Sequence, residues 1–386
     1  MKFKILFLII VSFVSTNLFS QSEINKIKKI NDGLYFMYFD SSNSKSTIVE
    51  FKEYLVMLEV PIIDKGGGAT QLVDDIKGGE KVMRTLKNYF PDKPLKYIMH
   101  SHWHMHSISS ITPFINEGVS IISTRMNFDV LSKFMDSNVV ARNMKNFIFV
   151  ESDSLVISDG ENEIIAYKFE QKDYPSTPTK DYLYFYIPKH NCMHAACMYT
   201  KWSGEPVDGK QVLSGREENL YNFITSKNIN PEFLIRLTNE KAEPNDMQDF
   251  DNLSEVNKNG IKSADIMNRY LSLDAISLKQ NRDEIVKEAL LKKIPASIFN
   301  SCVYAELRKK ELDRALSFAI IQTMINPSDA NSWDTLGEVY YFMGETGIAK
   351  SYEKQKNKMF PSADGGGEEV WQKDLEQHKI IWEKLK

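Results

Sequence analysis

Cysteine is rare in this chain of 386 residues, which contains only Cys192, Cys197 and Cys302. An odd number of cysteines cannot all pair within one chain, and three are too few to hold a protein of this length together. A disulfide scaffold is therefore excluded. Cys192 and Cys197 lie close together along one expected strand, where the geometry for a bridge is poor.

The sequence also lacks the short motifs that bind nucleotides or mark a serine hydrolase. It has no Gly-Lys-Ser/Thr phosphate loop, no Gly-x-Ser-x-Gly elbow and no two-glycine dinucleotide fingerprint. The formal net charge is −4, whereas a nucleic-acid-binding protein usually has a basic face. We therefore expect no nucleotide cofactor and no nucleic-acid partner.

Long apolar runs are missing except near the N-terminus. Lys2 and Lys4 precede an apolar stretch from Ile5 to Val14, and the small residue Ser20 stands before Gln21. This pattern is typical of a cleavable secretory signal, and the stretch is shorter than the ~20 residues that span a bilayer. We expect residues 1–20 to be a signal peptide, the protein to be exported (periplasmic or secreted), and the mature chain to have no transmembrane segment. Removal of the signal peptide would change the net charge from −4 to −6. The alternative to a cleaved signal is a membrane anchor.

The chain is long enough for more than one folding unit, because a single core rarely exceeds ~250–300 residues. Between about residues 28 and 240, β-branched and aromatic runs alternate with segments of helical spacing, which predicts two sheets flanked by helices. Residues 244–260 are polar and are expected to be a linker. They would join a domain of residues 21–243 to a helical domain of residues 261–386.

The helical domain contains an internal repeat. Thirty-four residues before Ala349 and Pro361 stand Ala315 and Pro327, which is the period of a tetratricopeptide repeat. We expect such a repeat at about residues 295–361, with a protein or peptide partner bound to it; a plain helical hairpin is the alternative. The residues that resemble the repeat pattern are Trp333, Leu336, Gly337, Tyr340, Gly344, Ala349 and Pro361.

Four of the seven histidines occupy alternate positions in one stretch: His100, His102, His104 and His106. Alternate residues of an extended strand point to the same side, so their rings would face one point if the stretch is extended. Neutral imidazole is the commonest metal ligand, and zinc takes three or four such ligands. The spacing predicts a metal site, and a His-rich polar loop is the alternative.

The segment from Leu95 to Ser107 resembles the signature of the metallo-β-lactamase superfamily, a hydrophobic strand followed by Thr or Ser and then His-x-His-x-Asp-His. The opening Gly33-Leu34-Tyr35 and the segment from Tyr182 to Pro188 are similar to the family as well. This resemblance covers about residues 28–240. It implies an α+β protein, with a four-layer αββα sandwich, a metal site at one edge, and the small all-α domain after it.

The resemblance implies that His102 and His104 are retained as ligands of one zinc ion. Glu59 stands in place of an acidic Asp after an early strand. Other ligands are lost, because the remaining family positions fall at or near His106, Ser107, Pro178, Cys197 and Thr238.

Two of these replacements are themselves able to bind metal. Imidazole and thiolate both suit zinc or copper, so we predict one zinc ion held by His102, His104, His106 and Cys197. Four protein ligands would leave no position for water, and such a site would be structural. The imidazoles of His100, His190 and His194 are alternatives, and no catalytic residue is assigned.

Two functions therefore stay open. The first is an exported, metal-dependent hydrolase with an altered His/Cys site, as the histidine spacing indicates. The second is a non-catalytic pseudoenzyme that acts as a binding or scaffold protein through its helical-repeat tail. The lost ligands favour the second, because the family's Asp accepts the proton of the nucleophile and His106 cannot do so as an anion. Tyr182 is expected to fill a strand between two layers, and Arg216 to lie at the surface.

Overall fold

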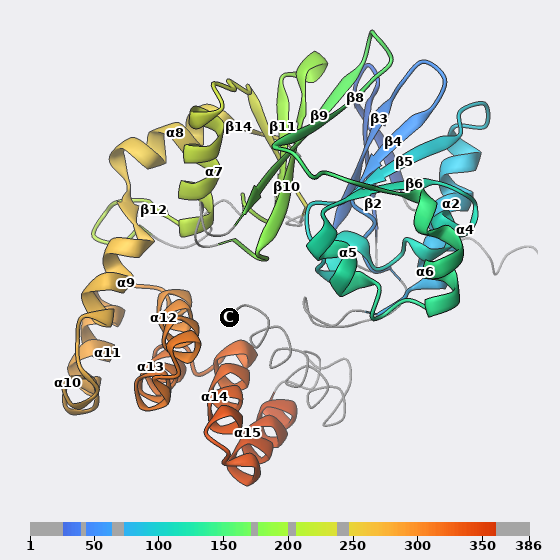
Figure 1. The fold of residues 1–386 in the computed structure, drawn as a ribbon. Helices are drawn as coiled ribbons and strands as arrows, with labels where there is room; N and C mark the ends of the chain where they lie inside the picture. Colours follow the sequence, from blue (N-terminus) through green and yellow to red (C-terminus); the bar gives the residue numbers. More distant parts are fainter. Residues whose placement is uncertain are drawn as a thin grey trace, which may run out of the picture.

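The structure is a computed structural model that describes residues 26–39, 44–63, 73–170, 177–199, 206–237 and 247–359. The expected signal peptide, Thr238 and Pro361 lie outside these residues. Two β-sheets face each other, helices cover their outer faces, and a helical region follows beneath them (Figure 1). Along the described part of the chain, no helix is long and apolar enough to cross a membrane.

The first sheet has seven strands in the order β1-β2-β3-β4-β5-β6-β7, antiparallel up to β4 and parallel from there on. Alternate residues of its strands point to opposite faces, as in any pleated strand. Met57 and Ile98 face the helices, whereas Leu58 and Met99 face the second sheet. The strands are β1 (Lys26–Asn31), β2 (Leu34–Tyr38), β3 (Lys45–Glu50), β4 (Leu55–Leu58), β5 (Leu95–Met99), β6 (Ser120–Ser123) and β7 (Phe147–Phe149).

The second sheet has six strands in the order β14-β13-β11-β10-β9-β8. All neighbours are antiparallel except β11 and β13, which are parallel. In β10, Tyr182 and Tyr184 face the outer helices and Leu183 and Phe185 face the first sheet, so the predicted position between two layers is confirmed. The strands are β8 (Ser154–Ser158), β9 (Glu163–Glu170), β10 (Asp181–Ile187), β11 (Cys192–Ala196), β13 (Phe233–Arg236) and β14 (Met247–Asp249).

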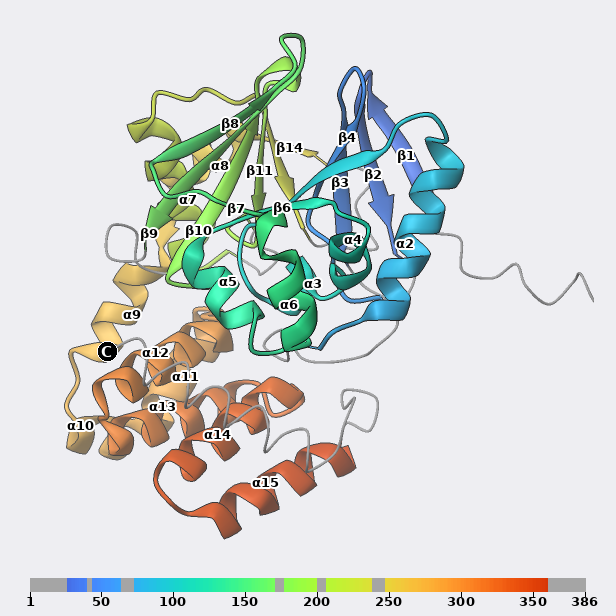
Figure 2. The ribbon, with the colours of Figure 1, turned by 45° about the vertical axis from the view of Figure 1, so that its right-hand side comes forward.

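Helices form the two outer layers (Figures 1 and 2). On the first sheet their apolar residues share one core with the strands, and on the second sheet another set does the same. The order is thus helix, sheet, sheet, helix, and the predicted four-layer αββα sandwich is confirmed. The first set is α2 (Ile76–Tyr89), α4 (Thr112–Asn116), α5 (Arg125–Leu131) and α6 (Ser137–Asn143); the second is α7 (Gly215–Ser226) and α8 (Phe250–Asn259). Two 3₁₀ turns are η1 (Met144–Asn146) and η2 (Pro188–His190).

The predicted linker at residues 244–260 is wrong where the structure describes it. Strand β14 completes the second sheet, and α8 packs on that sheet's outer face. The composition of this segment is polar, but Phe250, Leu253 and Val256 are spaced three residues apart and pack as one helical face into the core. A short parallel pair, β12 (Val212–Leu213) with β15 (Ile261–Lys262), then joins the sandwich to the helical region.

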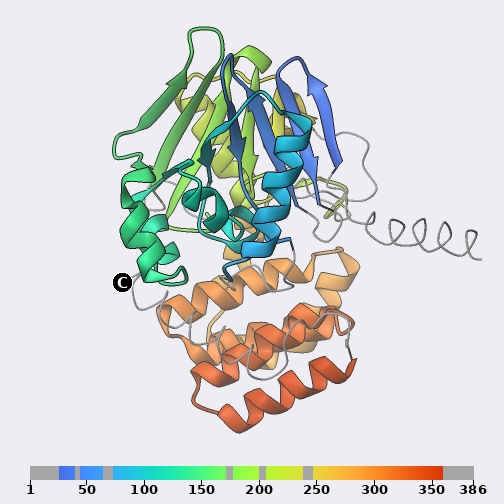
Figure 3. The same ribbon diagram turned by 90° about the vertical axis from the view of Figure 1, so that its right-hand side faces the viewer.

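Seven helices make up the helical region, within the part of the chain that is described (Figure 3). They are α9 (Ser263–Leu271), α10 (Ala275–Gln280), α11 (Arg282–Leu291), α12 (Ala296–Lys309), α13 (Leu312–Ile325), α14 (Ala330–Phe342) and α15 (Thr346–Met359). Corresponding helices of the pairs α12–α13 and α14–α15 begin 34 residues apart. The small residues Ala315 and Ala349 are fully buried at equivalent places in these pairs.

Helix α2 passes close to α4, and Gly79 makes this approach feasible. Gly78 and Gly79 both lie inside α2 and are buried. A Cβ at Gly79 would overlap the carbonyl oxygen of Ser110 and lie 2.9 Å from ring carbons of Pro113. Gly79 therefore serves the packing of α2 against α4.

We expect Gly79→Ala to lower the free energy of unfolding by about 1–3 kcal/mol, because the added methyl group forces α2 away from α4. Gly347→Ala is the matched control, since this exposed helical glycine has open space where a Cβ atom would be added. The control should leave stability unchanged or raise it by up to about 1 kcal/mol. Urea denaturation followed by circular dichroism checks both, and equal effects would contradict the packing argument.

Candidate functional site

The histidine stretch does not continue β5 as an extended strand, so that expectation is wrong. The chain bends after Met99 and then forms the short helix α3 (Met105–Ile108). The backbone of Ser101 explains the bend, because its amide donates to Glu59 Oε1 at 3.0 Å and its carbonyl accepts from the Leu183 amide at 2.9 Å. These bonds replace the ladder that a longer strand would need.

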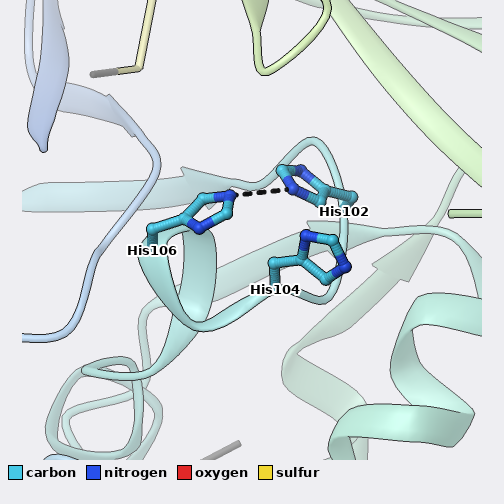
Figure 4. A group of neighbouring side chains, drawn as sticks. All are labelled: His102, His104 and His106. Carbon is cyan, nitrogen blue, oxygen red and sulfur yellow. Dashed lines mark hydrogen bonds between the residues drawn. The ribbon is translucent and has the colours of Figure 1, made fainter. Parts of the chain in front are cut away.

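The bend nevertheless gathers three of the four imidazoles (Figure 4). The nitrogens of His102, His104 and His106 lie within 4.8 Å of one another, and the two Nε2 atoms of His102 and His106 are 3.1 Å apart. His102 is fully buried, whereas His104 and His106 are partly exposed. A turn and one helical turn therefore bring the histidines together, whereas the sequence predicted that strand alternation would do so.

Cys197 joins this cluster from the second sheet. It follows β11 directly, after Ala196, whose φ of 46° turns the chain out of the strand. The Sγ atom of Cys197 lies 3.0 Å from His106 Nε2. Cys197 thus contacts one of the three clustered histidines, His106, from a different sheet. The three cysteines of the chain are free thiols.

The remaining candidate histidines point elsewhere. His100 Nε2 lies 2.8 Å from Ser123 Oγ, inside the first sheet. His194 Nδ1 lies 3.3 Å from Thr47 Oγ1. His190 belongs to η2, at the opposite end of β11 from Cys197. The structure gives none of these three a place among the four clustered side chains.

A buried carboxylate, that of Glu59, underlies the cluster. It accepts the Ser101 amide through Oε1 and the Ser107 hydroxyl through Oε2, and it lies 3.5 Å from His194 Nε2. Ser101 and Ser107 stand at the two ends of the loop that carries the histidines. Glu59 thus closes this loop, and its own φ of 66° turns the backbone at the end of β4.

Burial keeps the imidazoles of His102 and His106 neutral. It lowers the pKa of His106 to about 4 and holds the pKa of His102 well below its usual value, with His104 adding to the effect on His102. Burial also raises the pKa of the Cys197 thiol to about 12, against the opposing charge of Arg216. Neutral imidazoles carry the lone pairs that a metal needs, while the thiol must lose its proton to bind.

The positions that the sequence resemblance suggests for a second metal offer no comparable set. Ser107, where the signature has a histidine, donates to Glu59, and Pro178 has no side-chain donor. Thr238 lies outside the described residues. Among the residues that are described, the clustered donors are sufficient for one ion.

Two residues beside the cluster were not expected there. Arg216 was predicted at the surface, but its Nη1 donates to the Cys197 carbonyl at 3.5 Å. It stands at the start of α7, which Ser214 and Glu217 begin with a capping box. Tyr182 stacks on His102 and bonds to the backbone of Cys197. No local sequence pattern marks either residue, since both contacts depend on how the sheets meet.

The layer order and the histidine motif after a central parallel strand make this a metallo-β-lactamase-like sandwich with an all-helical region after it. No protein-family model matches the sequence, and no curated protein matches it. Solved structures similar to this chain include a metallo-β-lactamase from Pontibacter korlensis (13% identity, 59% of this chain and 95% of that one, TM-score 0.40). Others are metallo-β-lactamase IND-7 (15%, 60% and 97%, TM-score 0.42) and FIM-1 from Pseudomonas aeruginosa in its mono-zinc form (10%, 60% and 93%, TM-score 0.41).

Replacing Glu59 by Ala should destabilise the protein by about 2–4 kcal/mol, because the Ser101 amide and the Ser107 hydroxyl lose their acceptor in a buried place. Glu50→Ala is the control, a half-buried carboxylate that binds Lys93 and Tyr35 away from the cluster. Its expected cost is about 1 kcal/mol. Urea denaturation measures both, and a smaller effect at Glu59 than at Glu50 would contradict its role in closing the loop.

Proposed function

We propose that this protein is an exported metal-dependent hydrolase with a single zinc ion held by His102, His104, His106 and Cys197. The observation that carries the proposal is that nitrogens of three imidazoles lie within 4.8 Å of one another, with a thiol from the second sheet beside one of them. Burying a cluster of polar side chains costs free energy of folding unless a ligand or hydrogen bonds satisfy them.

The donor set suits zinc. Zinc binds imidazole nitrogen at about 2.0–2.1 Å and thiolate sulfur at about 2.3 Å, so neighbouring ligand atoms of a tetrahedral site lie about 3.3–3.6 Å apart. The distances of 3.1 Å between His102 and His106 and 3.0 Å between His106 and Cys197 need only a small outward movement to fit. Softer metals such as copper take the same ligands.

Hydrolysis requires one of the four positions to open. A zinc ion with an open position acts as a Lewis acid and lowers the pKa of water to about 7. His102 is fully buried and its Nδ1 bonds to Ser101 Oγ at 2.7 Å, so it is the fixed ligand. His104 is partly exposed, and we assign it as the ligand that gives way. Arg216 adds a positive charge beside Cys197.

The exported mature protein should begin at Gln21 and should keep about one equivalent of zinc after dialysis. His102→Ala, His106→Ala and Cys197→Ser should each weaken zinc binding by more than the about 10–100-fold that the loss of a supporting partner costs. His190→Ala, in a turn away from the cluster, is the control and should bind zinc like the wild type. N-terminal sequencing and metal analysis provide the measurements; a wild-type protein without bound metal would reject the site.

A second function is favoured by the helical region. The pairs α12–α13 and α14–α15 repeat at the 34-residue period of tetratricopeptide repeats, whose concave faces commonly bind peptides. If all four ligands stay on the metal, the site has no position for water and is structural. The protein would then be a pseudoenzyme that recruits a protein or peptide through its tail.

Turnover separates the two functions. For a hydrolase, the zinc-loaded protein should cleave an ester, lactam, thioester or sulfate substrate, and His102→Ala should abolish the reaction while His190→Ala leaves it unchanged. For a scaffold, zinc binds with normal stoichiometry and no substrate of these classes is turned over. Steady-state assays on samples of known metal content distinguish the two functions. Residual activity in His102→Ala would point to a contaminating enzyme.

A further inference from the structure

His100 stays out of the histidine cluster, and its ring connects the first sheet to the loop that carries the other three histidines. It directly follows β5 and is fully buried. Its Nε2 atom lies 2.8 Å from Ser123 Oγ at the end of β6, and its Nδ1 atom lies 3.2 Å from the backbone carbonyl oxygen of His102. Both ring nitrogens therefore have a partner.

These two contacts explain how an imidazole is stable in this place. The two residues before it, Ile98 and Met99, are fully buried apolar residues of β5. A polar ring buried beside them costs free energy of folding unless its nitrogens are hydrogen-bonded, whereas an apolar side chain would meet no such condition. The contacts of His100 hold its ring between β6 and the loop, and the ring in turn holds the His102 carbonyl.

The proton on the His100 ring is placed by this carbonyl. A carbonyl oxygen only accepts, so Nδ1 must carry a proton, whether the ring is neutral or charged. With the proton on Nε2 alone, lone pairs of Nδ1 and of the His102 oxygen would face each other at 3.2 Å. With the proton on Nδ1, the Ser123 hydroxyl donates to Nε2. The Thr124 carbonyl, the other acceptor near that hydroxyl, keeps the Phe128 amide as its donor.

The His102 carbonyl is part of the peptide bond that leads to Trp103 and on to His104. A rotation of this peptide would turn the chain between two proposed ligands, whose ring centroids are 4.7 Å apart. Glu59 closes the loop at its two ends. His100 holds it at a third point, between the ends and next to the ligands themselves.

We propose that His100 is a positioning residue of the metal site, which donates its Nδ1 proton to the His102 carbonyl and so fixes the peptide that directs His102 and His104 toward the ion. Loss of a group that supports metal ligands from outside commonly costs about 10–100-fold in metal affinity. The affinity effect rests on the proposed function, whereas the proton on Nδ1 is a property of the metal-free protein.

The test compares His100→Asn with His100→Gln. The amide nitrogen of Asn is as many bonds from Cβ as Nδ1, and that of Gln as many as Nε2. Asn therefore keeps the donor toward the His102 carbonyl, and Gln keeps only the contact with Ser123. Competition with a chelator gives the zinc dissociation constant. We expect His100→Asn to bind zinc nearly as tightly as the wild type and His100→Gln to bind it about 10–100-fold more weakly.

Long-range ¹H–¹⁵N spectra of the metal-free wild type report which ring nitrogen of His100 carries a proton, and we expect Nδ1. A ring without a proton on Nδ1 overturns the inference. Zinc binding that is as tight in folded His100→Gln as in His100→Asn, or tighter, overturns it too.

Ser123→Ala keeps the inference testable if neither variant at position 100 folds, because it removes only the other contact of the ring. The Nδ1 proton and the zinc affinity should stay as in the wild type, and loss of either overturns the inference. A wild-type protein that binds no zinc overturns the proposed function instead. The ring proton in the wild type and in Ser123→Ala then still tests the bond from His100 to the loop.

Discussion

The buried carboxylate of Glu59 is the contact on which the arrangement of the site depends. A buried carboxyl group is stable only when hydrogen-bond donors surround it, and Glu59 has such donors at the two ends of the histidine loop, in Ser101 and Ser107. Opening the loop into a strand would remove both donors at once. The same closure brings His102, His104 and His106 together, so the contacts of one buried carboxyl group determine the geometry of the histidine cluster.

Much of the fold could be predicted because its strands alternate cleanly between two cores. In β10 the tyrosines alternate with Leu183, Phe185 and Ile187, and the two sets pack into opposite cores. Strand β1 is hard to recognise in the sequence because it is an edge strand, where charged residues such as Lys28 and Lys29 obscure the pattern. Helix α8 could not be recognised from the polar composition of the stretch before Gly260. Three apolar residues are enough to pack a short helix against a sheet, and they leave the composition polar.

The site was only partly predictable, for a physical reason. His102 and His104 follow from a local motif, and Cys197 from a family position, so their meeting could be anticipated. The bend after Met99 could not, because it depends on Glu59 and Leu183, which are distant in sequence. Tyr182 and Arg216 are ordinary residues of a strand and a helix start. They come to lie beside His102 and Cys197 only because the two sheets pack face to face.

The junction between the sandwich and the helical region has a consequence for what happens if the chain is cut. Val207 and Val212 belong to the sandwich side in sequence, yet they pack in the core of the helices, and β12 pairs with β15 across the boundary. A protease that nicked a surface loop between the two parts would not release them. The fragments would stay associated as a non-covalent pair, and a gene fragment ending at either side would expose apolar surface prone to aggregation.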